Sequence, residues 1–392
     1  MSSVLPNPVG SAGSASGDPL GVTPLGETHL EAPVRHGEEF RDKLPSQVST
    51  QSARKSLTRE ELAYFTKLSA AQSLWSLAQT YGLLIFTFAL GLYAFSIIGP
   101  KPLVGAILLI VSVMLMGCWQ HWLAIISHES THYRVFESRA ANDWIGRISG
   151  MLIGVSTFSY RIVHRLHHNH LYEAIDPDMA LMAGYPRGKA YLWKKLLKDI
   201  AGFTAWRNYL YFFGAPAANA VTGQKQDPLA DTTASLRKLA LRDRWIVVGF
   251  HVAMPLLMFA IGYGIEYLVL WVLPAITVQA FILRLRAVAE HGAPSDTSTA
   301  LGAARTNIDI PALVRMVLFP HSVNYHLEHH LYPAVPHYRL AELHALLKAR
   351  GVLDGAEVRS FRVTMTRVFG ARGSAPDAAA KPGVIASPGF NV

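Results

Sequence analysis

The sequence predicts an all-α integral membrane protein, with four transmembrane helices in two pairs and a cytosolic helical cap that carries clusters of histidine. Hydrophobic residues make up 51% of the 392 residues, charged residues make up 16%, and the mean hydropathy is +0.22. Soluble domains carry about 25% charged residues. Four apolar runs also approach or exceed the roughly 20 residues that cross a bilayer. These observations together favour a membrane protein over a soluble one.

The four apolar runs fall into two pairs joined by short turns. They cover residues 74–98, 103–127, 245–262 and 265–285. The second run, at about 1.5 Å per residue, is roughly 37 Å long and exceeds the ~30 Å hydrocarbon core. We therefore expect this helix to emerge from the membrane and to present His128 outside it. Pro255 and Pro274 should kink the two later spans.

Basic residues predict the orientation of the chain. The two short loops between paired spans share one basic residue, Lys101, whereas residues 128–244 and the chain from Arg284 onward carry most of the Arg and Lys. Because loops rich in Arg and Lys stay in the cytosol, both termini and the middle loop should be cytosolic. The expected location is a bacterial inner membrane. The same bias explains the net charge of +9, so we expect no nucleic-acid partner.

Composition also divides the chain. Residues 1–56 and 370–392 are rich in small residues and proline and should be disordered, which leaves one membrane domain at 57–369. Thr58 and Glu61 have capping-box spacing, and an amphipathic helix should end at Gly351. Residues 145–158 should form one surface or re-entrant helix, and the single cysteine, Cys118, should be a buried apolar residue.

Three histidine clusters lie outside the spans, on the side predicted to be cytosolic. They read His128-Glu-Ser-Thr-His132, His164-Arg-Leu-His167-His168 and His326-Leu-Glu-His329-His330. Residues at i, i+3 and i+4 share one face of a helix, and imidazole is the commonest metal ligand. Eight imidazoles exceed the needs of one tetrahedral zinc site, so they indicate two metal ions.

Three other interpretations compete with this one. A histidine-rich surface segment is the plainest. The segment from His128 to His132 also matches HExxH, the motif of zinc proteases with Glu129 as general base, but an intramembrane protease leaves six histidines without a role. A metal transporter needs ligands near the bilayer midplane, where the spans offer His251, which we expect to be a packed interior residue.

The three boxes, in this order around two pairs of spans, resemble the membrane fatty acid desaturase and hydroxylase family. The resemblance covers roughly residues 60–350 and is closest at Asn324-Tyr-His-Leu-Glu-His-His-Leu-Tyr-Pro333. It implies a four-span fold, two iron ions cycling between Fe2+ and Fe3+, and O2 as co-substrate for attack on an unactivated C–H bond. The metal ligands it implies are His128, His132, His164, His167, His168, His326, His329 and His330, with His291 as a ninth.

The chain departs from one branch of that family. Acyl-CoA desaturases carry an asparagine four residues before the ninth histidine, and this chain has Ala287. Desaturation of a fatty acyl chain is the commonest activity among similar sequences and is the predicted one. Hydroxylation, carotenoid ketolation and olefin-forming decarboxylation remain alternatives on the same scaffold. No catalytic residue beyond the metal ligands is expected.

Several neighbours of the boxes are candidates to orient the ligand imidazoles. They are Glu129, Glu328, Asp176, Asp178 and, more remotely, His121. His170, His321 and His337 fall outside the box spacing and are left out of the ligand set.

The expected partners are the lipid bilayer, a long-chain fatty acyl or related lipid substrate, and an electron donor. No haem, iron–sulfur or dinucleotide motif is present. A separate ferredoxin-, rubredoxin- or cytochrome b5-like donor with its reductase should therefore supply electrons. The basic segment that includes Arg187, Lys189, Lys194 and Lys195 could dock such a donor or contact phospholipid.

Overall fold

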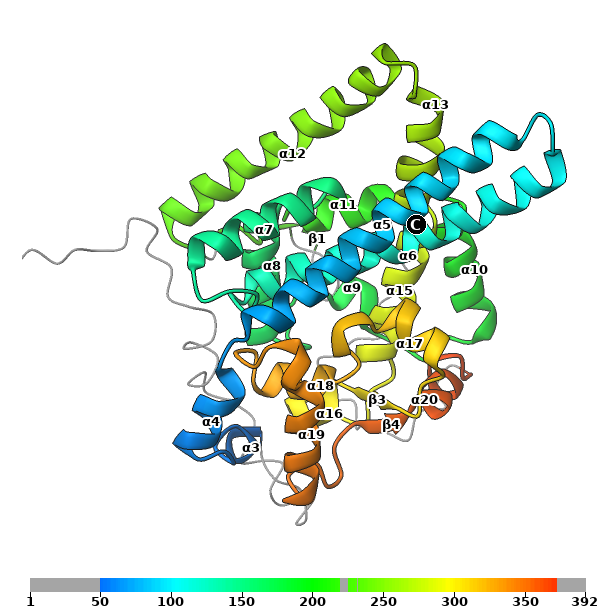
Figure 1. The fold of residues 1–392 in the computed structure, drawn as a ribbon. Coiled ribbons are helices and arrows are strands. Elements are labelled where there is room, and N and C mark those ends of the chain that lie inside the picture. The colour runs from blue at the N-terminus through cyan, green and yellow to red at the C-terminus, as the bar shows by residue number, and fades with distance from the viewer. Residues whose placement is uncertain (1–49, 219–224, 231, 372–392) are drawn as a thin grey trace, which may run out of the picture.

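The computed structural model describes residues 50–218, 225–230 and 232–371. Four long apolar helical segments dominate it: Arg59–Ile97, Pro102–Thr131, Ala234–Ala260 and Gly264–His291. This confirms the predicted helical, four-span membrane fold. Within these segments α5 (Ala70–Ile97) packs against α6 (Pro102–Thr131), and α12 (Ala234–Ala260) meets α13 (Gly264–Tyr267) at the top of Figure 1.

The helices extend beyond the apolar runs that predict them. Helix α6 continues to Thr131 and so carries His128 out of the apolar segment, as expected. Helix α12 begins eleven residues before the predicted span, because the Thr233 side chain accepts a hydrogen bond from the backbone N–H of Leu236 and caps it. The apolar run marks only the part of each helix that lipid can surround.

The fourth span is irregular near its proline. It passes from α13 into a π-helical turn (Leu268–Val272), then α14 (Leu273–Ile276) and α15 (Val278–His291). The break between α14 and α15 falls at Thr277, whose φ and ψ are −115° and −83°. Pro274 lacks an N–H and cannot continue the ladder of hydrogen bonds, so the irregularity around it matches the predicted kink. Helix α12, by contrast, stays helical through Pro255.

The segment between the two pairs of spans forms a group of shorter helices. Their bounds are α7 Arg139–Leu152, α8 Thr157–Asn169, α9 Met179–Met182, α10 Lys189–Ile200 and α11 Ala205–Phe212. The prediction of a single helix over residues 145–158 is wrong, because α7 ends at Leu152 and α8 begins at Thr157. Gly154 adopts φ +76° and ends α7, and Ser156 caps the next helix through its side chain. The break allows α8 to run in a new direction.

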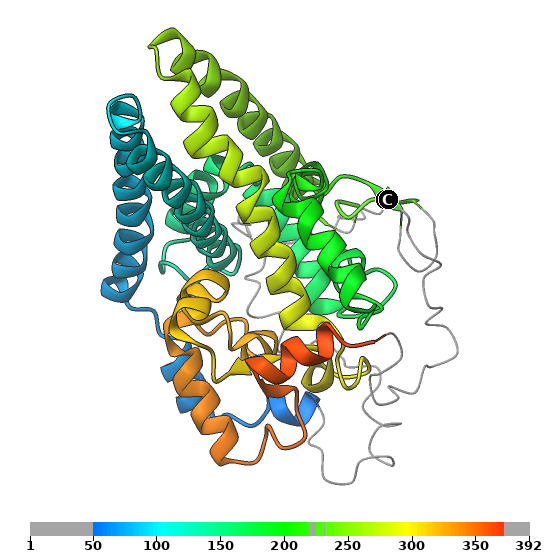
Figure 2. The ribbon, with the colours of Figure 1, turned by 90° about the vertical axis from the view of Figure 1, so that its right-hand side faces the viewer.

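The chain after the fourth span folds beneath the membrane segments (Figures 1 and 2). It contains α16 Ala300–Ala303, β3 Thr306–Ile308, α17 Ala312–Leu318, a 3-10 turn at Pro320–Ser322, α18 His326–Leu331, a second at His337–Arg339, α19 Leu340–Ala349, β4 Val358–Ser360 and α20 Phe361–Val368. Strands β3 and β4 pair in parallel, with Thr306 opposite Val358. The other ladder in the described residues joins β1 (Ala217–Ala218) and β2 (Lys225–Gln226) in antiparallel. Gly351 follows α19 at φ +69°, as its predicted C-cap role requires.

The start of the described chain differs from its prediction. Residues 50–56 fall in the segment expected to be disordered, yet α3 (Thr50–Arg54) packs against α18. Ala53 is fully buried, and its carbonyl accepts a hydrogen bond of 2.6 Å from the Tyr332 hydroxyl. Helix α4 (Arg59–Thr66) begins at the predicted capping box of Thr58 and Glu61. Residues 1–49 and 372–392, the rest of the expected disordered tails, lie outside the described residues.

The largest apolar core joins the spans to the cap. Trp119, Leu123 and Ile125 of α6 pack there with Ile282 of α15 and Phe319. Burying a side chain of this size contributes roughly 1.5–3 kcal/mol. Cys118 belongs to the same core, as expected. This packing fixes the histidine-bearing ends of α6 and α15 relative to each other.

Candidate metal centre

Four helices bring the nine predicted histidines together. His128 lies in the last turn of α6 and His132 caps that helix, His291 ends α15, and the other two boxes lie on α8 and α18. All nine side chains are buried, with 5% or less of each residue exposed. The predicted helical placement of the boxes is therefore found, and helices far apart in sequence converge on one region.

The histidines divide into two groups of close nitrogen atoms. The first group contains His128, His132, His164, His168 and His329, and the second contains His167, His291, His326 and His330. Within each group the candidate ligand atoms all lie within 4.8 Å of one another. In each group, histidines spaced i and i+4 stay together, because they share a helix face. The middle histidine of each HxxHH box joins the opposite group.

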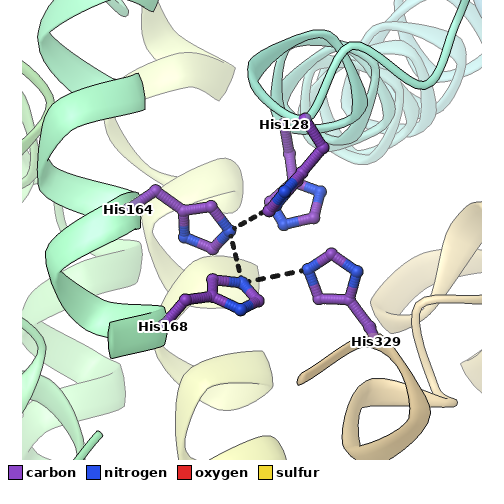
Figure 3. Close-up of side chains that lie close together, drawn as sticks. His128, His164, His168 and His329 are labelled. Atoms are coloured by element: carbon purple, nitrogen blue, oxygen red, sulfur yellow. Dashed lines mark hydrogen bonds between the residues drawn. The ribbon is translucent and has the colours of Figure 1, made fainter. Parts of the chain in front are cut away.

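The nitrogen atoms of each group face one another directly. In the first group His164 Nε2 lies 2.9 Å from both His132 Nε2 and His168 Nε2, and His329 Nε2 lies 3.1 Å from His168 Nε2. Figure 3 shows the rings of His128, His164, His168 and His329 pointing toward a common centre. In the second group His326 Nε2 lies 2.8 Å from His291 Nε2 and 3.1 Å from His330 Nε2.

This arrangement fits a bound cation. A neutral imidazole carries one N–H and one lone pair, so several Nε2 atoms that meet at one point cannot all find a donor among themselves. Burial and the neighbouring imidazoles lower the pKa of His168, His326 and His330 well below the usual value. These rings are therefore neutral, which is the form that binds metal ions. Both groups are compatible with metal binding.

Carboxylates hold the far edges of two of the rings. Glu129 lies 3.2 Å from His128 Nδ1 through Oε1, and its Oε2 lies 3.3 Å from His337 Nδ1. Asp176 lies 3.0 Å from His167 Nδ1. A carboxylate on Nδ1 fixes the tautomer and leaves Nε2 with its lone pair toward the metal site. Two of the predicted orienting acids thus contact the predicted rings.

Two carboxylates, Asp176 and Asp178, lie close to His167. Burial lowers its pKa, but the negative charges of Asp178 and Asp176 outweigh burial and raise the pKa to about 9. Asp178 Oδ2 lies 3.6 Å from His167 Nδ1. On the same side, Glu290 Oε2 lies 3.8 Å from His326 Nε2 and Glu290 Oε1 accepts a hydrogen bond of 2.7 Å from Arg286 Nε. Three carboxylates, those of Asp176, Asp178 and Glu290, therefore lie beside the second group.

A cavity of about 90 Å³ opens beside both groups. Its polar wall includes Asp178, Arg286 and Glu290, and its apolar wall includes Phe212 and Leu283. Ala287, the departure from the acyl-CoA desaturase pattern, also lines it. The cavity lies between the histidines and residues of α11 and α15.

The other histidines singled out in the sequence lie apart from the two groups. His121 lies 3.3 Å from the Leu318 carbonyl, His170 pairs with Glu173 at the surface, and His321 lies 3.1 Å from the Thr80 hydroxyl. His251 lies 2.8 Å from the carbonyl of Met151, the hydrogen-bonded interior role expected of it. None of these four belongs to a group of candidate metal ligands among the described residues.

Some supporting contacts were missed by sequence reasoning. Glu328, between His326 and His329, accepts hydrogen bonds from Thr306 and from the Nδ1 of His344, the latter at 2.6 Å. The spacing of His337 excluded it, yet it contacts Glu129. His344 lies on α19 in an amphipathic pattern, where a histidine near the apolar face was the only available signal.

Comparison with known proteins agrees with this site. The fatty acid desaturase family matches residues 104–362. Three relatives are the acyl-lipid (9+3)-(E)-desaturase of Dimorphotheca sinuata, 26% identical over 58% of this chain and 63% of its own length; the dihydrorhizobitoxine desaturase of Bradyrhizobium elkanii, 24% identical over 59% and 65%; and the oleoyl-12-hydroxylase of Ricinus communis, 22% identical over 60% and 64%. The chain thus spans a little under two thirds of each relative. Since the family match covers more than half of the chain, this integral membrane protein belongs to the fatty acid desaturase family of oxidoreductases.

Proposed function

We propose that the two histidine groups bind two iron ions and that the protein uses O2 to introduce a double bond into a fatty acyl chain. The observation that carries the proposal is the division of nine buried histidines into two groups of converging ligand atoms. The proposed ligands are the five residues of the first group and the four of the second. Imidazole suits several transition metals, but the redox chemistry of O2 requires an ion such as iron and excludes zinc.

Bound iron would supply the O2 chemistry that cleaves an unactivated C–H bond, with electrons that a separate donor protein delivers. The chain's own residues position and shield that chemistry. Glu129 and Asp176 fix the imidazole tautomers of His128 and His167. Phe212 and Leu283 form an apolar wall that can hold an alkyl chain and keep water from the histidines.

The site argues against the zinc-protease alternative. In HExxH enzymes the glutamate activates water at the metal, so its carboxylate must reach the open metal position. Here Glu129 lies against the Nδ1 edge of His128 and against His337, away from the converging Nε2 atoms. Six further histidines also share the two groups with His128, His132 and His291.

The specific reaction rests on the relatives. Three that match this chain are named as desaturases, one as a bifunctional desaturase/conjugase, one as a conjugase and one as a hydroxylase. Desaturation is therefore the main proposal. Hydroxylation is the second candidate, because the relative named a hydroxylase matches the same share of the chain. Ketolation and olefin-forming decarboxylation remain chemically open on the same site.

The proposed setting is a bacterial inner membrane with both termini and the histidine groups on the cytosolic side. The single Lys101 in the loop between the first two spans, against many Arg and Lys around the histidines, supports this orientation. Electrons would come from a separate ferredoxin-, rubredoxin- or cytochrome b5-like protein and its reductase.

Metal analysis and product analysis together test the proposal. The purified full chain should contain about two irons, and membranes that contain it, supplied with fatty acids, O2 and a donor system, should form a new internal double bond detectable by mass spectrometry. One zinc per chain with peptidase activity would overturn the di-iron assignment. A new alcohol, ketone or 1-alkene without an internal double bond would reject desaturation and retain the metal centre.

A further inference from the structure

We infer that the helical hairpin formed by α10 and α11 (residues 189–212) is embedded in the cytosolic boundary of the bilayer, and that a lipid tail reaches the metal-site cavity sideways, between α11 and the fourth span. The second half of this inference rests on the proposed function. The first half concerns a surface and its partner, the anionic lipid interface, and stands without it.

The hairpin lies against a membrane span. Helix α10 packs on α15 and α11 packs on α14, both parts of the segment Gly264–His291, which is long and apolar enough to cross a membrane. Figure 1 shows α10 beside α15. At the turn between the two helices, Gly202 adopts φ +82°, and a Cβ there would lie 3.6 Å from the Ile276 carbonyl. Residue 276 lies fifteen residues before the end of that segment at His291, so the tip of the hairpin lies beside the span and not beyond its histidine-bearing end.

A buried ion pair holds the tip in place. Asp199, fully buried at the end of α10, pairs with Arg284 of α15, whose Nη2 donates a hydrogen bond of 3.1 Å to Oδ1. The hydroxyl of Thr204, at the start of α11, also donates to Asp199. Breaking this ion pair would leave an unpaired charge buried away from water, so the two side chains stay in contact. The hairpin is thus fastened to the span rather than resting loosely beside it.

The outer surface of the hairpin combines large apolar residues with cations. The exposed apolar residues are Trp193 (46%), Leu197 (61%), Phe203 (71%), Trp206 (55%) and Leu210 (48%). Lys194, Lys198 and Arg207 lie among them. Tryptophan and leucine with interleaved Lys and Arg are typical of helices in the headgroup boundary, where long basic side chains reach the phosphates. A soluble acidic donor could pair with the cations, but it would leave Phe203 and Trp206 in water.

The hairpin also forms one wall of the cavity beside the histidines. Asn208 and Phe212 of α11 and Leu283 of α15 line that cavity. The same three residues line a second, narrow cavity of about 10 Å³, whose far side includes Ala205 and Ala275. Because the two cavities share these lining residues, they lie next to each other, and we infer that they form one path. The path leads from the boundary between α11 and α14, at the apolar side of the hairpin, to the histidine groups.

Spin labels can measure the depth of the hairpin directly. Single cysteines would replace Phe203 at the tip, Lys189 at the exposed start of α10, and Phe86, a lipid-exposed position of α5, in the full chain in anionic vesicles. Native Cys118 is 6% exposed and does not compete for the label. The label at 203 should resemble that at 86, accessible to O2 and protected from a water-soluble nickel chelate. If the label at 203 instead had the accessibility of the label at 189, the inference would be overturned and the surface would be assigned to a soluble donor.

A bulky substitution tests the sideways path. Ala275→Trp should close the narrow cavity and lower turnover of palmitic acid in membranes at least tenfold, with iron content unchanged. Leu273→Trp, on the same helix but 40% exposed, is the matched control and should keep wild-type turnover. Unchanged turnover in Ala275→Trp would reject the path. An inactive wild-type protein would reject the proposed function instead, and the spin-label depth would still decide the position of the hairpin.

Discussion

The two histidine groups differ in number and in charge. The first has five imidazoles, and His128 among them contacts the carboxylate of Glu129. The second has four imidazoles, with Asp176 and Asp178 on His167 and Glu290 near His326. Catalytic metal sites keep an open position, whereas closed sites are structural. Under the proposed function, the second group is the one with room for a further ligand, because it has one histidine fewer.

The largest effect should come from removing one proposed ligand from each group in turn, which tests whether the two groups hold separate ions. His168 and His330 are the last histidines of their boxes, and their rings stack at 4.2 Å, yet they belong to different groups. His168→Ala and His330→Ala should each abolish detectable turnover and lower the iron content from about two toward one, because an opened coordination sphere loses its ion. Metal analysis of the purified chains checks this.

Spectroscopy of those two variants should differ. In His168→Ala the remaining iron should occupy the group near Asp176, and in His330→Ala it should occupy the group near Glu129, so their Mössbauer spectra should not coincide. Identical spectra, or two irons retained in either variant, would contradict the division into two groups.

Loss of the Asp176 carboxylate should lower activity less than loss of a metal ligand does, and more than loss of a surface carboxylate. Asp176→Asn removes the negative charge from the imidazole edge while it keeps the size of the side chain. Activity should fall about 10–100-fold and iron affinity should weaken, as is usual for partners of ligand histidines. The matched control is Glu173→Gln, three residues away, which pairs with His170 at the surface and should behave as wild type. Equal effects of the two substitutions would remove the special role of Asp176.

A pH experiment should test whether the ion pair of Arg305 and Glu357 stabilises the end of α15, which carries His291 of the second group. Arg305 donates to Glu357 at 2.8 Å and to the carbonyl of Ala289, two residues before His291. Burial raises the pKa of Glu357, but hydrogen bonds and charge from Arg359 and Arg305 outweigh it and lower the pKa to about 2. A depressed carboxyl pKa adds stability that is present above pH 4.5 and is lost as the pH falls toward 2.

Glu357→Gln should therefore lower the apparent Tm at neutral pH, by an amount equivalent to about 2–3 kcal/mol, and should flatten the loss of Tm between pH 4.5 and 3. Thermal unfolding followed by circular dichroism measures both effects. Glu60→Gln, on α4, should leave the profile unchanged. A wild-type acid slope in Glu357→Gln would show that this pair does not stabilise the end of α15.

The smallest effect should come from a contact that serves both groups equally. His344 holds Glu328, which lies on α18 between His326 and His329, one from each group. Because Thr306 also donates to Glu328, His344→Ala should lower activity only about two- to fivefold. Iron loss, if measurable by titration with a chelator, should be the same for both ions. Selective loss from one group would place His344 nearer to that group than its contacts indicate.

The sequence predicted the helices and the nine histidines, but not how the histidines are shared. Periodicity places His164 and His168 on one face of α8, and both do join one group. His167 is rotated by one residue from His168 and faces α15 and α18 instead, and nothing local to α8 specifies which helices lie there. The break between α7 and α8 depends on Gly154 and Ser156, and a Cβ at Gly154 would lie 2.6 Å from the ring of Tyr209, a neighbour that the local sequence does not reveal.

The exchange of middle histidines between boxes bears on how the protein is made. Each group needs side chains from α8 and α18, and α18 lies more than 150 residues after α8 in the chain. Under the proposed function, neither ion can find its full set of ligands until ribosomal synthesis has passed α18 and the last span has been inserted. Complete metal loading would therefore come late in synthesis or after it, and it would hold together two segments that are made at different times.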